Sequence, residues 1–157
     1  MKKLISLALS LVCVLGLTAC SPKDEAPAKS YQVSTPAAMQ EAGAFSEQLE
    51  TLDAEVAFML YHLDDFELTP EDLTDCAILR SSGATCEESA VLVLADEAKA
   101  AKAAKALNAY VKEQIDANTD YRPEEIPKLE KALVDQQGNT VLLVVSNDME
   151  LANSVLK

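Results

Sequence analysis

The chain has 157 residues, with 26 acidic and 13 basic side chains and a formal net charge of −13 at pH 7. So acidic a chain lacks the basic patches that nucleic-acid binding requires, and we expect no nucleic-acid partner. The same charge disfavours a flat contact with an anionic lipid surface. The length is that of one domain, and hydrophobic residues make up 49% of it, enough for a buried core.

The N-terminal segment has the pattern of a bacterial lipoprotein signal. Two lysines precede an apolar run, Leu4 to Ala19, which is shorter than the ~20 residues of a membrane-spanning helix. Leu17-Thr18-Ala19-Cys20 matches a lipobox, in which small residues precede the cut and a Cys thiol accepts diacylglycerol. We therefore expect cleavage between Ala19 and Cys20, and an acylated Cys20 that anchors the protein to the outer face of the cell membrane. The alternative is an ordinary secretory signal with Cys20 beside its cleavage site.

Three segments follow from this division. Residues 1–19 are the expected signal peptide, and residues 20–44 are the lipid-bearing Cys and a flexible linker. Pro22, Pro27 and Pro36 lie there among Ala, Ser and Lys without an apolar period. A helical start near Ala37–Ala44 is the alternative. Residues 45–157 are expected to form a single domain.

Two cysteines remain once Cys13 has left with the signal and Cys20 carries lipid. Cys76 and Cys86 could form a disulfide, because an extracytoplasmic compartment permits one. The alternative is a pair of free thiols that behave as small apolar side chains. Their spacing is not that of a zinc site, and the chain has one His.

The first half of the domain predicts a helix, a short helix and a strand. Asp53 can cap a helix to about Leu63. Thr69 and Pro70 begin a short second helix, and residues 75–80 read as a strand. The core face of the first helix is expected to carry Val56, Met59, Leu60 and Leu63.

The middle of the domain predicts a turn, a strand and a long helix. Thr85 and Glu88 fit a capping box, which predicts one helical turn inside the connection. The continuous apolar run Ala90–Ala95 is typical of a central strand. Asp96 can cap a helix over residues 97–117, whose apolar face recurs at helical spacing.

The last third predicts a short helix, a hairpin and a terminal helix. Pro123 begins the short helix, and residues 132–135 and 140–146 form the hairpin. Asn147 and Glu150 fit a second capping box, which opens the terminal helix. The element order α-β-β-α-β-β-α predicts an α+β domain with a four-stranded, mainly antiparallel sheet packed against helices.

A set of motifs resembles a known family. They are the turn Gly83-Ala84-Thr85 followed by acids and a strand, the Asp-capped Ala/Lys helix, the stretch Tyr121-Arg122-Pro123-Glu124-Glu125, and the closing strand Val141–Ser146. Over roughly residues 45–156 the chain resembles small lipoproteins of Gram-positive bacteria that are grouped only by a domain of unknown function. The resemblance implies a similar location and fold. It implies no established activity and no catalytic residues.

The sequence gives only weak evidence for a catalytic, metal-binding or anion-binding site. His62 stands beside two aspartates, and no activated Ser motif accompanies it. An acidic stretch from Asp64 to Asp75 offers oxygen ligands, but its spacing matches no calcium loop. Residues 81–85 could hold an anion, yet one glycine and the acids that follow favour a plain turn. We therefore expect no catalysis, no metal and no cofactor.

The expected function is that of a membrane-anchored, non-catalytic module that binds a protein partner in the cell envelope. The anchor, the linker and the missing catalytic groups motivate this expectation. The alternative is a lipoprotein that binds a small ligand, as the receptor component of an uptake system. An enzyme is the third hypothesis.

Overall fold

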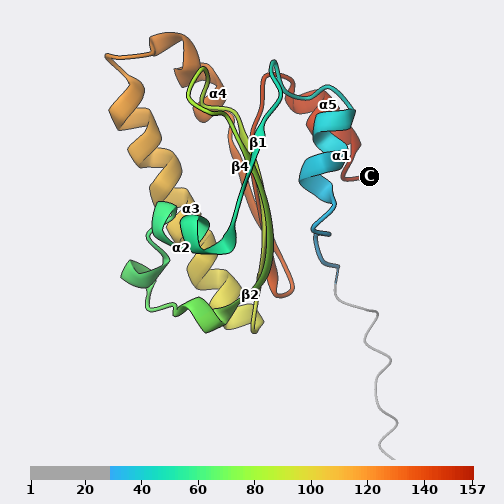
Figure 1. The fold of residues 1–157 in the computed structure, drawn as a ribbon, viewed down its shortest axis with the longest axis vertical. Coiled ribbons are helices and arrows are strands. Elements are labelled where there is room, and N and C mark those ends of the chain that lie inside the picture. The colour runs from blue at the N-terminus through green and yellow to red at the C-terminus, as the bar shows by residue number, and fades with distance from the viewer. Residues whose placement is uncertain (1–28) are drawn as a thin grey trace, which may run out of the picture.

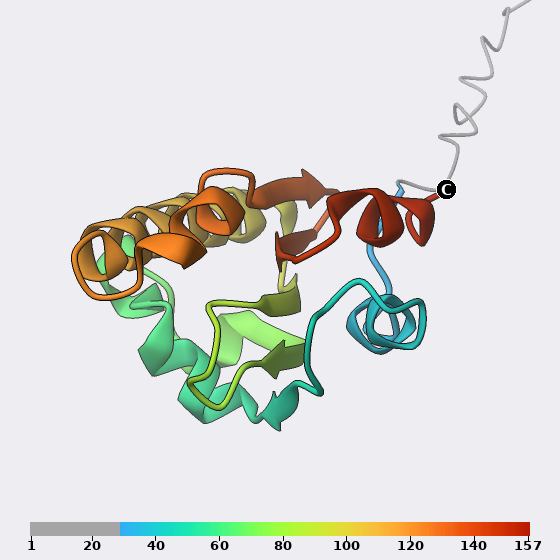
Figure 2. The ribbon, with the colours of Figure 1, turned by 90° about the horizontal axis from the view of Figure 1, so that it is seen from above.

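The computed structural model describes residues 29–157. A five-stranded sheet lies between two layers of helices (Figures 1 and 2). Its order is β1-β2-β3-β5-β4, and every neighbouring pair is antiparallel. The strands are β1 (Glu50–Leu52), β2 (Leu73–Arg80), β3 (Glu88–Leu94), β4 (Leu133–Gln137) and β5 (Thr140–Val145). The helices are α1 (Thr35–Glu41), α2 (Ala54–Leu60), α3 (Glu97–Asn118), α4 (Ile126–Leu129) and α5 (Met149–Ser154), with 3-10 turns η1 (Leu63–Phe66), η2 (Pro70–Asp72) and η3 (Pro123–Glu125).

The two central strands separate two hydrophobic cores. Side chains alternate along β3, so Leu92 faces the core with α2 and α3, whereas Val91 faces the core with α1 and α5. Strand β5 alternates in the same way, with Leu143 on the first side and Leu142 on the second. Burial on both faces explains the continuous apolar runs. It confirms the central strand predicted from residues 90–95, although β3 spans Glu88–Leu94 and ends before Ala95.

Helix α3 forms much of the first layer, as predicted. Asp96 is its N-cap, and the Asp96 carboxylate accepts a hydrogen bond from the Lys99 backbone N–H at 2.7 Å. Ala100 and Ala103 are fully buried, which brings the helix backbone close to the sheet. Leu107 and Tyr110 continue the same buried face toward the C-terminal end.

The α+β class is confirmed, but the predicted number of four strands is wrong. The additional strand is β1, which pairs with residues Ile78–Arg80 of β2. Three residues are too few to show the alternation that identifies a strand in a sequence. Pairing with β2, which lies more than twenty residues further along the chain, makes this segment a strand.

The helical turn predicted at Thr85 and Glu88 is also wrong. No helix forms between β2 and β3, and Glu88 is the first residue of β3. The Thr85 hydroxyl instead accepts a hydrogen bond from the Glu87 backbone N–H and donates one to the Glu47 carboxylate. Long-range partners therefore take up the groups that a local capping box would have used.

Two segment boundaries differ from expectation. The predicted linker is folded from Thr35, because α1 buries Met39 against the sheet and Ala44 is buried as well. The terminal helix is capped by Asp148 rather than Asn147, and the Asp148 carboxylate accepts from the backbone N–H groups of Glu150 and Leu151. The predicted signal peptide, the lipobox and Cys20 lie outside the described residues.

Candidate functional site: an apolar groove on helix α2

Helix α2 presents apolar side chains to solvent. Its predicted N-cap is confirmed, since the Asp53 carboxylate accepts from the Val56 backbone N–H at 3.0 Å. Its predicted core face is wrong in part. Ala57 and Tyr61 are buried, whereas Val56 is 40% exposed and Met59 is 60% exposed. Hydrophobic side chains left in water on one surface mark a candidate interaction site.

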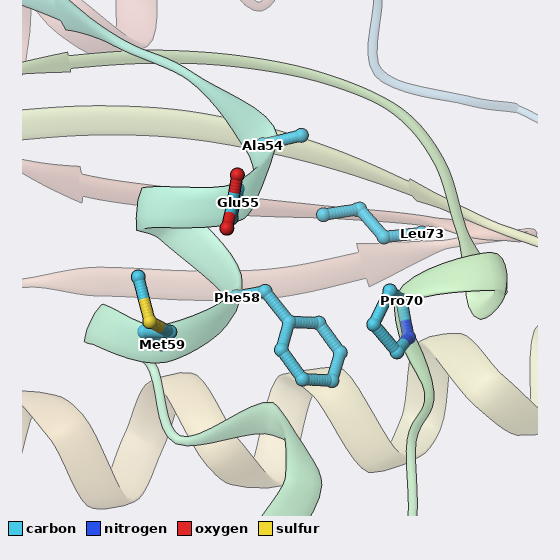
Figure 3. A pocket seen from close by; sticks show the side chains of 6 residues that line it. All are labelled: Ala54, Glu55, Phe58, Met59, Pro70 and Leu73. Carbon is cyan, nitrogen blue, oxygen red and sulfur yellow. The ribbon is translucent and has the colours of Figure 1, made fainter.

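An apolar groove borders Met59 (Figure 3). It lies between α2, the turn η2 and the first residue of β2, and its volume is about 550 Å³. The Phe58 ring points across the gap toward Pro70 (Figure 3). Leu73 lies on the same side of the gap as Pro70. The lining residues are Ala54, Glu55, Phe58, Met59, Pro70 and Leu73.

One edge of β2 is open beside the groove. Strand β1 pairs with residues Ile78–Arg80 only, so among the described residues no strand flanks residues 73–77 on that side. The backbone N–H of Cys76 donates to the side chain of its exposed neighbour Asp75 at 2.8 Å. Leu73 belongs both to this edge and to the groove, so the two features form one continuous surface.

The groove lies in the most acidic part of the chain. Residues 47–79, which include β1, α2, η1, η2 and nearly all of β2, contain ten Asp and Glu and no Lys or Arg. Two of the ten form ion pairs, Asp72 with Lys99 and Glu67 with Lys102. Within residues 29–157 the other eight make no ion pair. Glu55 lines the groove, and Asp53 and Asp75 lie close to its lining residues in the chain, so the surface around the groove is negative.

A buried carboxylate, Glu88, holds α2 and α3 against the sheet. It is 2% exposed and accepts hydrogen bonds from the hydroxyls of Tyr61 at 2.5 Å and Tyr110 at 2.8 Å. The Arg80 guanidinium lies 3.3 Å from the same carboxylate. Burial raises the pKa of Glu88, and the donated hydrogen bonds oppose that rise. Because Tyr61 directly follows the C-terminal end of α2, this contact fixes the position of the groove-forming helix.

A second buried carboxylate, Glu87, joins the segment after α1 to helix α4 at the far end of the sheet. It is fully buried and accepts from the backbone N–H and hydroxyl of Ser46, at 2.7 and 2.8 Å. Lys128 lies 2.9 Å from Glu87 and 3.0 Å from Glu125. Burial by itself would lower the pKa of Lys128. The hydrogen bonds to the two carboxylates raise that pKa by a larger amount, so the net pKa is above its ordinary value. The side chains therefore form a satisfied structural network.

The turn at residues 81–85 is satisfied within the chain. The Ser81 hydroxyl accepts from the backbone N–H groups of Gly83 and Thr85, and it donates to the Glu47 carboxylate at 2.7 Å. Glu47 thus occupies the hydroxyl donors that an external anion would need. For the two buried carboxylates, Glu87 and Glu88, the only signal in the sequence was a pair of adjacent acids at the start of an apolar strand.

The remaining candidate residues are dispersed. His62 is exposed and adopts a left-handed conformation between α2 and η1. Within residues 29–157, no three side chains of the metal-binding types come together. The acidic stretch instead caps η2 and pairs with lysines of α3.

The disulfide considered between Cys76 and Cys86 is not formed, and both thiols are free. Cys76 lies opposite Leu92, whereas Cys86 lies beyond the pair formed by Arg80 and Glu88. Four strand positions correspond to roughly 13 Å at the usual rise per residue, far beyond the reach of a disulfide. Burial raises the pKa of both thiols, which makes them poor nucleophiles.

These features define a class of protein: an α+β domain with a sheet covered on both faces, internally satisfied buried charges and an acidic surface that carries an apolar groove. Residues 59–146 match the family model described as a domain of unknown function, DUF4358. The match covers more than half of the chain, and the chain belongs to this family. Neither a curated protein nor a solved structure matches it. No helix within residues 29–157 combines the length and apolar character needed to cross a bilayer.

Proposed function

We propose that this protein is a lipid-anchored, non-catalytic module of the cell envelope that binds a protein partner through the groove on α2. The observation that carries the proposal is the exposed apolar surface of α2, where Met59, which is 60% exposed, lines a groove of about 550 Å³. Exposed apolar side chains beside an unpaired strand edge favour a protein-binding role over catalysis. The lipobox supports the anchor and the location.

The rest of the polar interior supports a binding role rather than a reaction. Among the described residues, no buried side-chain nitrogen or oxygen lacks a hydrogen-bond partner. Glu87, Glu88 and Glu125 are each held by donors of the chain itself. In this proposal their function is structural: Glu88 fixes α2 beside the groove through Tyr61, and Glu87 and Glu125 hold the opposite end of the sheet.

The groove is tested by Met59→Gln. Crosslinking in intact producing cells, followed by affinity capture and mass spectrometry, should recover an envelope protein with the natural chain. The variant should reduce that recovery at least fivefold, because an interface core residue is replaced by a polar one. Leu151→Gln is the control, since Leu151 is also an exposed apolar residue, 39% exposed, and lies on α5 away from the groove. Equal recovery with both variants would contradict the proposal.

The anchor is tested by Cys20→Ala. Without the thiol no diacylglycerol can be attached, so we expect the protein in the soluble fraction or as an uncleaved precursor. Cell fractionation with immunoblotting measures this, and Cys13→Ala serves as the control because Cys13 leaves with the predicted signal. A mature, membrane-bound product of Cys20→Ala would show that the anchor is assigned wrongly.

A small apolar ligand is the second candidate occupant of the groove. Its volume lies within the range of ligand pockets. A ligand that binds only the folded state raises the melting temperature, so a metabolite panel read by thermal melts distinguishes this function. A rise that Met59→Gln abolishes would favour it over protein binding.

A further inference from the structure

We infer that the partner docks as an extended, basic segment that adds a strand to the open edge of β2 and places apolar side chains in the groove. This inference rests on the proposed function and specifies the partner's conformation and charge. The open edge indicates the conformation of the partner segment, the groove indicates its side-chain pattern, and the acidic surface indicates its charge.

The open edge favours an extended partner. An exposed strand edge offers unpaired N–H and C=O groups, which recruit an additional strand through main-chain hydrogen bonds. Beyond the end of β1, residues 73–77 of β2 form such an edge. The Cys76 N–H donates to the exposed carboxylate of Asp75, and a partner carbonyl can replace that carboxylate without disturbing the ladder with β3. A segment of about five residues fits the length of this edge.

The groove sets the side-chain pattern of that segment. In an added strand alternate side chains point to the same face of the sheet. Leu73 lies on the face that carries α2 and α3, and it lines the groove with Phe58 and Met59. Side chains of the partner that point to this face therefore enter an apolar environment. The partner should carry apolar residues at alternate positions.

The negative charge around the groove determines which charge we expect at the remaining positions of the partner segment. Asp53 and Glu55 lie at the N-terminal end of α2, and Asp75 is exposed on β2 itself. No Lys or Arg occurs in residues 47–79 to compensate them. Lys or Arg in the partner would complement this field, whereas a second copy of this acidic chain would meet like charge along the whole edge.

The test uses three labelled ten-residue peptides and the full chain purified in detergent, with binding measured by fluorescence anisotropy. The first peptide alternates Lys and Val, and the second alternates Glu and Val. The third has the composition of the first, rearranged so that its valines repeat at helical spacing. We expect the alternating Lys/Val peptide to bind at least tenfold more tightly than either of the others, with an affinity that falls as salt rises.

Two further measurements locate the site. Hydrogen exchange should show at least tenfold stronger protection of the Cys76 N–H when the peptide is bound, because this group lies on the open edge that a new strand would cover. Glu55→Lys should weaken the binding about fivefold, and Glu150→Lys, an equal charge change on α5, should leave it within twofold. N-methylation of alternate peptide amides should abolish binding, since it removes the strand hydrogen bonds.

The outcomes separate this inference from the proposed function. If Met59→Gln blocks capture of a partner but the helical-pattern or Glu/Val peptide binds equally well, or no peptide binds, the extended basic mode is overturned and protein binding stands. A dimer in sedimentation equilibrium that Met59→Gln dissociates would assign the groove to a second copy and also overturn the inference. If neither a partner nor a peptide depends on Met59, both proposals fail.

Discussion

Lys128→Met should destabilise the domain by about 3 kcal/mol, because it removes the cation from a buried pair of carboxylates. Glu87 is fully buried, and without Lys128 its negative charge stays in the interior with only the Ser46 donors. Glu125 loses the same partner. The expected value lies at the low end of the range for a broken buried pair, since the Lys128 side chain keeps 18% exposure.

Urea unfolding of the natural chain and the variant measures this loss as a lower midpoint with an unchanged slope. Lys102→Met is the matched control. Its partner Glu67 has a side chain that is 84% exposed, so water screens this ion pair and the loss of stability should be much smaller. Equal losses for the two lysine variants would show that burial of Glu87 does not set the strength of the Lys128 contact.

Glu88→Ala should cost about 3 kcal/mol or more, because it leaves the Tyr61 and Tyr110 hydroxyls without their acceptor in the core. Glu88→Gln should retain most of the stability, since the amide oxygen can accept one of those hydrogen bonds and fills nearly the same volume. Thermal unfolding should therefore place the Gln variant well above the Ala variant. If the two variants melt together, the hydrogen bonds contribute little.

The pH dependence of Glu88→Gln follows from the raised pKa of the natural side chain. In the folded state Glu88 holds its proton more tightly than in the unfolded chain, where the pKa is near its ordinary value of 4.5. The stability of the natural protein relative to the variant should thus be highest at low pH. It should decline as pH rises from 4.5 through the folded pKa and stay constant above it.

Other carboxylates act in the opposite direction but cancel in this comparison. Hydrogen bonds and ion pairs lower the pKa of Glu47, Glu67 and Asp72, so each of them loses stabilising interactions as pH falls. These groups are present in both proteins, so the difference between the two urea midpoints at each pH reports Glu88. A difference that does not change with pH would show that Glu88 does not titrate across this window.

Local signals predicted much of the fold. Asp53 and Asp96 cap their helices as expected, because a cap depends on a carboxylate and an N–H group three residues away. The continuous apolar run of β3 and the segment of β5 were likewise correctly interpreted as strands. The reason is that burial on both faces of a sheet leaves little room for polar residues at any position.

The candidate site was harder to predict, because the sequence does not show which face of a short helix is buried. Helix α2 has seven residues, about two turns, so its apolar side chains are compatible with more than one buried face. The hydrogen bond from Tyr61 to Glu88 across the core fixes which face of α2 is buried. That orientation leaves Met59 exposed. The two partners are 27 residues apart in the chain.

The composition, the caps of α2 and α3, and the continuous apolar runs depend on neighbouring residues, so the sequence alone determined them. Together they predicted an acidic α+β domain behind an N-terminus that resembles a lipoprotein signal. Strand β1, the burial of Glu87 and Glu88, and the open edge of β2 were decided by the tertiary structure. Each depends on contacts between distant segments, as when Ser46 meets Glu87 across 41 residues of chain. Only such contacts determine whether a charge is buried, a short segment becomes a strand, or an apolar side chain stays in water.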